Sequence, residues 1–267
     1  MVEGAADPAV APGSITFLAR EARRDAAKVW RELRLPLVFT FLLVVVLEST
    51  RAHLESLAAQ PFSRSVLGLA AAGLFGLEVV LLLPLSAITV PVCRLVLLGE
   101  SARSLQWQRI AAVACWGVLL IAASALLAVP ILFGLSILRL PLVVALIYLL
   151  LRLSFVIPSV AVGEHVARWT DRIADSWRLT RGWAVKLFLA ELLAVLPIGL
   201  AILVPYICIL RALLAWYPAA YADMLSGPWV RPVVYSLMAC ISTALQSAVV
   251  SHAYRIVRTS HPLTRPS

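Results

Sequence analysis

The chain has 267 residues, of which 62% are apolar and 14% charged, whereas soluble domains average about 45–50% and 25%. Its mean hydropathy of +0.94 leaves too little polar surface to cover a soluble globule, which excludes that class and makes the bilayer the expected solvent. The net charge of +9 does not require nucleic acid as a partner, because arginine-rich loops beside anionic phospholipid explain it.

Six apolar windows long enough to cross a bilayer follow one another, since a crossing helix needs about 20 residues. Before them we expect a disordered tail over residues 1–13, without a cleavable signal, and an amphipathic interfacial helix capped by Ser14. The first span is the weakest and is expected to borrow length from that helix. A single membrane domain is predicted over residues 14–256 and a C-terminal tail over 257–267. The expected spans are 29–48, 66–92, 110–130, 138–160, 183–204 and 229–250.

Basic residues are divided unequally between the two sides of these spans. Of the 23 arginines and lysines, 18 fall on the side that holds both chain ends and 5 on the other. Because cytoplasmic loops carry the excess of Lys and Arg, this partition predicts six crossings with both termini in the cytoplasm.

The longest polar stretch between spans, residues 163–182, reads "GEHVARWTDRIADSWRLTRG". Its apolar residues recur every three or four positions, which predicts a second interfacial helix with its indoles at headgroup level. Docking of a membrane or cytoplasmic protein partner is the alternative. The residues expected to carry either role are Trp169, Arg172, Asp175, Trp177 and Arg178.

An internal duplication is suggested by four short correspondences in the same order. "LRLPLV" occurs at 33–38 and 138–143, and a glutamate stands six residues before a proline in "EVVLLLPL" (78–85) and "ELLAVLPI" (191–198). Val-Pro pairs follow both, and "WQR" at 107–109 corresponds to "WVR" at 229–231. Chance is the alternative, because aliphatic runs align easily. A real three-helix repeat would insert its second copy upside down, giving an inverted three-plus-three bundle.

Charges and prolines inside the spans are the candidate functional residues. Glu78 and Glu191 would be equivalent in the repeat and either structural or part of an ion path. Arg152 lies thirteen residues after Arg139, which puts it at about the depth of Glu191, so we predict that Arg152 and Glu191 form a buried ion pair. Prolines remove helix hydrogen bonds, and the expected helix breaks are at Pro84, Pro91, Pro158, Pro197 and Pro205.

The segments "RLSFVIPSVAV" and "DSWRLTRG" resemble the signature of uncharacterised bacterial six-helix membrane proteins, the YciC-like group and the membrane domain attached to some glycerophosphodiester phosphodiesterases. "CRLVLLGE" at 93–100 is similar to that family's segment after the second span. The resemblance implies a bacterial inner-membrane location and no assigned activity. It places the family's motif on Arg152, Pro158, Ser176, Trp177, Leu179, Thr180 and Gly182.

Enzyme motifs are missing from the sequence, and we expect neither catalysis nor a cofactor. The four cysteines have no metal spacing and are expected to be small core residues. The function expected first is a non-catalytic membrane component that organises lipid or partner proteins. The alternative is a small proton- or ion-coupled transporter that uses Glu78 and Glu191. A water-accessible cavity touching both glutamates would favour transport.

Overall fold

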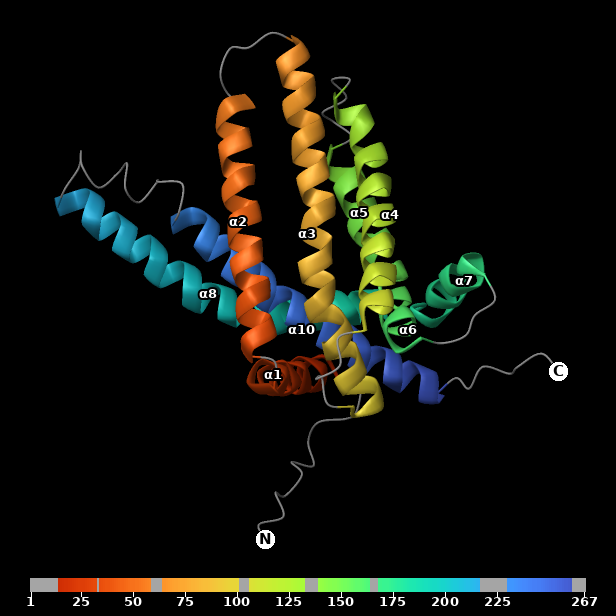
Figure 1. Cartoon of the computed structure of the whole chain (residues 1–267). Helices are drawn as coiled ribbons and strands as arrows, with labels where there is room; N and C mark the ends of the chain where they lie inside the picture. The colour runs from red at the N-terminus through yellow and green to blue at the C-terminus, as the bar shows by residue number, and fades with distance from the viewer. Residues whose placement is uncertain are drawn as a thin grey trace.

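A computed structural model describes residues 14–32, 34–58, 64–100, 106–132, 139–163, 168–216 and 230–260. This part of the chain contains helices and turns but no strand, as the composition predicts (Figure 1). The helices are α1 (Ile15–Glu32), α2 (Arg34–Ala58), α3 (Arg64–Leu98), α4 (Trp107–Leu132), α5 (Arg139–Leu153), α6 (Val156–Val162), α7 (Trp169–Leu179), α8 (Ala184–Trp216) and α10 (Val230–Ser260).

Five stretches are long and apolar enough to cross a membrane, which establishes an all-α, multi-pass architecture. The remaining expected span coincides with α4, whose described apolar part, Trp107–Ala122, is shorter than a full crossing. The count of six crossings therefore stays a prediction. The five stretches are Leu37–Leu54, Gly73–Leu98, Leu140–Val162, Ala184–Ile209 and Pro232–Ser260.

The first span begins later than the predicted range of 29–48. α1 ends at Glu32 and α2 starts at Arg34, so the apolar stretch Leu37–Leu54 takes its length from residues after 48 and not from the amphipathic helix. Pro36 falls in the first turn of α2, where a missing backbone N–H costs no helix hydrogen bond. The sequence misplaced this span because hydrophobicity alone does not mark the break between α1 and α2.

α1 is a packed part of the bundle as well as an amphipathic helix. The Ser14 hydroxyl accepts a hydrogen bond from the backbone N–H of Phe17 at 3.2 Å, as the predicted cap requires. Its apolar face packs against α8, α10 and α3, and Leu18, Ala19 and Ala22 are fully buried. The expected tail at 1–13 lies outside the described residues, whereas the expected C-terminal tail is helical as far as Ser260.

The buried core is concentrated where α10 crosses α1, α3 and α8. We call this region the base and define it as α1, residues 86–98 of α3, residues 152–162 with α6, residues 169–180 with α7, and residues 247–258 of α10. It lies at the lower end of Figure 1, where the chain enters α1 and leaves α10. Its fully buried side chains include Ile88, Val92, Phe155, Val249 and Ala253.

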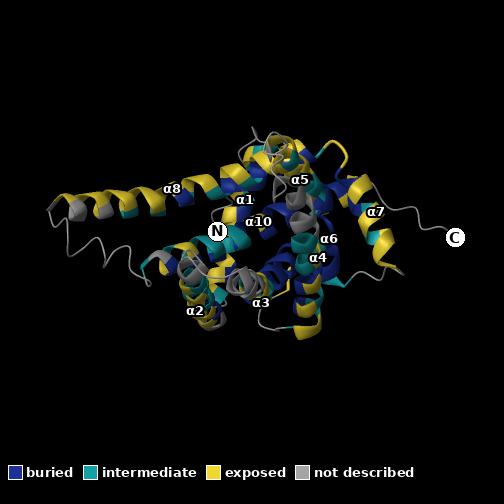
Figure 2. Cartoon of the chain, turned by 90° about the horizontal axis from the view of Figure 1, so that it is seen from above, coloured by how far each residue is buried: buried dark blue, intermediate teal, exposed yellow. Residues whose placement is uncertain are grey.

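Away from the base, parts of three apolar helices have few protein neighbours. We call residues 38–46 of α2, 140–150 of α5 and 196–209 of α8 the outer spans. Many of their large side chains face outward, and Figure 2 shows α8 as a long arm lined with exposed residues. Lipid is the solvent that such surfaces require.

Four of the five prolines do not break their helices. α3 continues through Pro84 and Pro91, and α8 continues through Pro197 and Pro205. Each ring removes one hydrogen bond, while the neighbouring turns hold the helix together. The fifth, Pro158, follows a real interruption: α5 ends at Leu153 and α6 begins at Val156, because the ring would clash with the carbonyl four residues earlier.

Both copies of the repeated hexapeptide begin a helix. Arg34 and Arg139 are the first residues of α2 and α5, and a proline stands at the third position of each. α2 starts at the base and α5 starts at the opposite end (Figure 1), the orientation that an inverted repeat requires. The packing is unequal, however: among the described residues α3 packs closely on α10, whereas the corresponding α4 and α8 are not a closely packed pair. The repeat stays a prediction.

Candidate functional site

Arg152 is buried at the end of α5, but it does not form the expected ion pair with Glu191. Its guanidinium carbon lies 4.4 Å from the ring centroid of Trp177 and 5.8 Å from that of Tyr148, a cation–π arrangement. The side chain is only 6% exposed, and within the described residues no carboxylate pairs with it. The prediction was wrong because α5 stops at Leu153 and α7 folds back over its end, which places Trp177 where a carboxylate was expected.

α7 is fastened to the end of α5 through a backbone carbonyl. The hydroxyls of Ser176 and Thr180 donate to the carbonyl oxygen of Arg152 at 2.8 and 3.1 Å. A helix end leaves such carbonyls without helical partners, so two buried hydroxyls satisfy this one. The side chains that α7 and its C-terminal cap bury against the protein are therefore those of Ser176, Leu179 and Thr180.

The aromatic residues of α7 lie on its outer side and are partly exposed. Trp169 stacks on Trp116 of α4, with ring centroids 6.2 Å apart, and the guanidinium of Arg172 lies 5.6 Å above the Trp169 ring. Asp175 accepts a hydrogen bond from Arg178 at 2.5 Å. Indoles that face outward at the edge of a bundle suit the headgroup zone, so the geometry is compatible with the predicted interfacial position.

A cavity of about 480 Å³ lies between α3, α4, α5, α8 and α10. Its walls are mainly aliphatic, with a group of hydroxyl and amide side chains from α3 and α10. Thr89 and Ser247 join these two helices through a hydroxyl–hydroxyl hydrogen bond of 3.2 Å. The polar residues that line it are Ser86, Thr89, Ser154, Glu191, Thr243, Gln246 and Ser247.

The two glutamates do not share this cavity. Glu191 lines it, whereas the Glu78 carboxylate pairs with Arg51 of α2 at 2.7 Å, with its side chain 40% exposed. The two glutamates therefore have different surroundings: Glu78 joins two neighbouring spans and Glu191 faces the interior. Their equivalence in the repeat stays a prediction. Identical spacing to a proline does not fix which way a helix face points.

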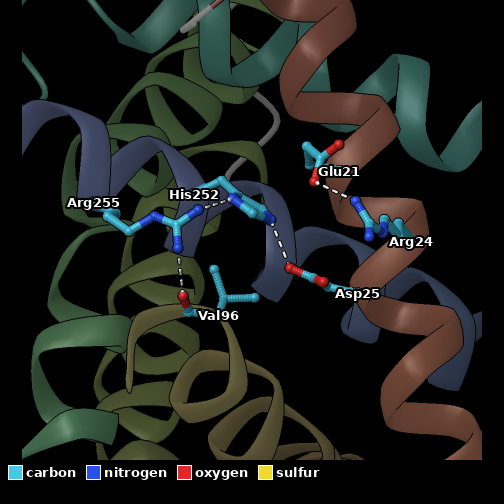
Figure 3. Close-up of polar contacts among 6 residues, drawn as sticks. All are labelled: Glu21, Arg24, Asp25, Val96, His252 and Arg255. Atoms are coloured by element: carbon cyan, nitrogen blue, oxygen red, sulfur yellow. Dashed lines mark hydrogen bonds and ion pairs between the residues drawn. The ribbon is translucent and has the colours of Figure 1, made fainter. Parts of the chain in front are cut away.

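A group of polar contacts, which we call the clasp, joins α1, α10 and α3 and was not predicted from the sequence (Figure 3). Nε2 of His252 lies 2.9 Å from the Asp25 carboxylate, and Nη2 of Arg255 lies 3.1 Å from His252 Nδ1. Because arginine can only donate, Nδ1 is the acceptor of this hydrogen bond, which leaves Nε2 to donate to Asp25. Arg255 also donates to the carbonyl of Val96 at 3.0 Å. Hydrogen bonding to His252 holds the pKa of Asp25 below its ordinary value of 3.8.

A hydrogen bond from Arg109 joins α4 to α6 at the base. Arg109 donates to the carbonyl of Ala161 at 3.2 Å, directly beside Gly163, which ends α6 with a φ of +73°. A Cβ atom on Gly163 would lie 1.8 Å from an Arg109 nitrogen. The left-handed backbone therefore favours glycine here, and any side chain would also require the Arg109 guanidinium to move.

The cysteines follow the expectation only in part. Cys93 and Cys240 are buried, whereas Cys115 and Cys208 face outward. In the part of the chain that the structure describes, histidine, cysteine and carboxylate side chains form no group that could hold a metal ion.

Comparisons with known proteins give no relative from which a function could be transferred. No protein-family model matches the chain, and neither the curated proteins nor the solved structures contain a significant match. The arguments that follow therefore depend on the site geometry alone.

Proposed function

We propose that this protein is a non-catalytic membrane component that binds a lipid or another amphiphile inside its helical bundle. The observation that carries the proposal is the cavity between α3, α4, α5, α8 and α10. Its volume of about 480 Å³ falls within the range of small-molecule sites, roughly 300–1,000 Å³.

The distribution of polarity in the cavity favours an amphiphile over a hydrophilic solute. Aliphatic side chains supply most of the wall, so an acyl chain or similar apolar group can occupy it without losing hydrogen bonds to water. Hydroxyls from α3 and α10 and the carboxyl of Glu191 supply a small polar group of partners for a headgroup or hydroxyl. Few convergent polar groups in an apolar pocket are typical of sites that recognise such ligands.

The transporter alternative is less well supported. It requires both glutamates along one water-accessible path, and Glu78 lies outside the cavity in a pair with Arg51. A role in organising partner proteins remains compatible with the exposed face of α7, but no described contact favours a particular partner.

The proposed location is the bacterial inner membrane, with both termini in the cytoplasm. The basic excess on the side of the chain ends supports this orientation. The contact between Asp25 of α1 and His252 of α10 supports an even number of crossings, because it brings the two terminal helices together.

Filling the cavity tests the proposal. We expect Thr243→Phe, which places a ring in the cavity, to reduce the lipid that co-purifies with the protein, as measured by native mass spectrometry from mild detergent. Thr50→Phe is the matched control, because Thr50 is exposed on α2 and its only described hydrogen bond goes to its own helix. Equal lipid retention by the folded Thr243→Phe variant and by the control would contradict the proposal.

The carboxyl of Glu191 provides a second measurement on the same cavity. Glu191→Gln keeps the shape and removes the ionisable carboxyl, so we expect it to change which lipid class is retained and not the amount of protein recovered. If ion transport were the function, Glu191→Gln would instead abolish solute movement in proteoliposomes while leaving bound lipid unchanged.

A further inference from the structure

We infer that a hollow beside α7 binds a phosphate group, either on an anionic lipid headgroup or free in solution. The hollow has a volume of about 750 Å³ and lies between the end of α5, α7 and the turn that follows α7. It is separate from the central cavity and does not depend on the proposed function. Its lining residues are Arg152, Thr170, Ile173, Ala174, Trp177, Arg178 and Arg181.

The buried charge of Arg152 is the first observation that supports a phosphate site in this hollow. The side chain is more than nine-tenths buried, and its Nε atom has no hydrogen-bond partner. The rings of Trp177 and Tyr148 provide cation–π contacts, but a ring face satisfies no N–H group. A buried guanidinium without a counter-ion is costly, and an anion in the hollow that Arg152 lines would supply the missing negative charge.

Two further arginines border the same hollow. Arg181 is exposed and has no side-chain ion pair among the described contacts, whereas Arg178 is held by Asp175. Three guanidinium groups therefore border one opening, and a single carboxylate offsets them. Their planar, forked donors match the oxygens of a phosphate group, and phosphate is the anionic group that a lipid headgroup zone supplies.

The scaffold keeps Arg152 in position before a ligand arrives. Ser176 and Thr180 hold its carbonyl, and Trp177 covers its guanidinium. The other two lining arginines come from α7 and from the turn that follows it. The site also lies at the base, next to the partly exposed Trp169 and Trp177 that mark the expected headgroup zone. Anionic phospholipid would be present there at high local concentration.

The test measures binding to the full chain in nanodiscs of phosphatidylcholine by isothermal titration calorimetry. One arm adds inorganic phosphate and the other adds dihexanoylphosphatidylglycerol. We expect Arg181→Gln to weaken binding by about tenfold, as loss of one charge-assisted hydrogen bond implies. Arg168→Gln is the matched control, because Arg168 is exposed before α7 and does not line the hollow. Arg152→Lys, which keeps the charge but removes the fork, should also weaken binding.

Each possible result of this experiment either supports or overturns the inferred phosphate site. Binding of both probes that Arg181→Gln weakens indicates a general phosphate site, and binding of the lipid alone identifies a headgroup site. Binding of neither probe overturns the inference, as does equal weakening by Arg181→Gln and Arg168→Gln. Thr243→Phe should leave this binding unchanged, so failure of the central-cavity proposal is distinguishable from failure of this one.

Discussion

The base and the outer spans differ in how their helices are held together. The base combines fully buried side chains with specific polar contacts, including the clasp of Asp25, His252 and Arg255 and the hydroxyl cap on Arg152. The outer spans of α2, α5 and α8 have mainly outward-facing aliphatic residues. Lipid provides no hydrophobic driving force between helices, so packing and hydrogen bonds at the base must fix the arrangement.

Truncating a buried aromatic residue should separate the two regions most clearly. Phe155 is 1% exposed and packs edge-to-face on Tyr254, with centroids 5.5 Å apart, whereas Phe39 of α2 is 70% exposed. We expect Phe155→Ala to lower the free energy of unfolding by about 3 kcal/mol, because it leaves a cavity. Phe39→Ala should change it by less than about 0.5 kcal/mol. Denaturation by SDS in mixed micelles measures both, and similar losses for the two variants would remove the distinction between the regions.

Glycine-to-alanine substitutions, which add one methyl group, give a second comparison between the base and a position outside it. Gly163→Ala should destabilise the protein by about 2 kcal/mol, because it forces a left-handed backbone on alanine and displaces the Arg109 guanidinium. Gly76 lies within α3, far from the base, and a Cβ atom there meets nothing within 4 Å. Gly76→Ala should therefore be neutral or stabilise by up to about 1 kcal/mol through helix propensity. Thermal denaturation of the two variants in the same detergent gives the signs, and a stable Gly163→Ala variant would count against the packing of α4 on α6.

The smallest expected effect is at the clasp, and it depends on pH. Asp25→Asn should cost about 1–2 kcal/mol at neutral pH, since it weakens a hydrogen bond to a charged group. The pKa of Asp25 is lower in the folded state, so this stabilisation is present above pH ~4 and is lost as the pH falls through the folded pKa. The wild-type protein should therefore lose more stability than Asp25→Asn on acidification.

Figure 3 supplies the control for this measurement. Glu21 and Arg24 also pair on α1, at 3.9 Å, but Arg24 is 80% exposed. Glu21→Gln should leave both stability and its pH dependence unchanged. If Asp25→Asn and Glu21→Gln give the same pH profile, the clasp does not anchor α1 to α10.

Composition and hydrophobic periodicity predicted the all-α membrane fold, the two amphipathic helices and most of the apolar spans. They could not predict the contacts of individual charges. Arg152 and Glu191 were placed at equal depth by helix rise, but depth says nothing of the direction in which a side chain points, and the two residues have different surroundings. Nothing in the local sequence of His252 indicates its contact with Asp25, which is 227 positions earlier in the chain.

The prolines show the same limit of prediction from sequence. A proline in a sequence predicts a missing hydrogen bond, and only the surrounding packing decides whether the helix stops. It continues through Pro84 and Pro197, and it stops before Pro158, where α7 folds back to cap the free carbonyl of Arg152.

The most direct test of the account is whether α1 and the C-terminal end of α10 lie on the same side of the membrane. Single cysteines at Arg20→Cys in α1, Thr259→Cys in α10 and His53→Cys in α2 can be introduced into a variant without the four natural cysteines. A membrane-impermeant maleimide should label Arg20→Cys and Thr259→Cys from the same face of sealed vesicles, and His53→Cys from the opposite face. Labelling of Arg20→Cys and Thr259→Cys from opposite faces would contradict the account.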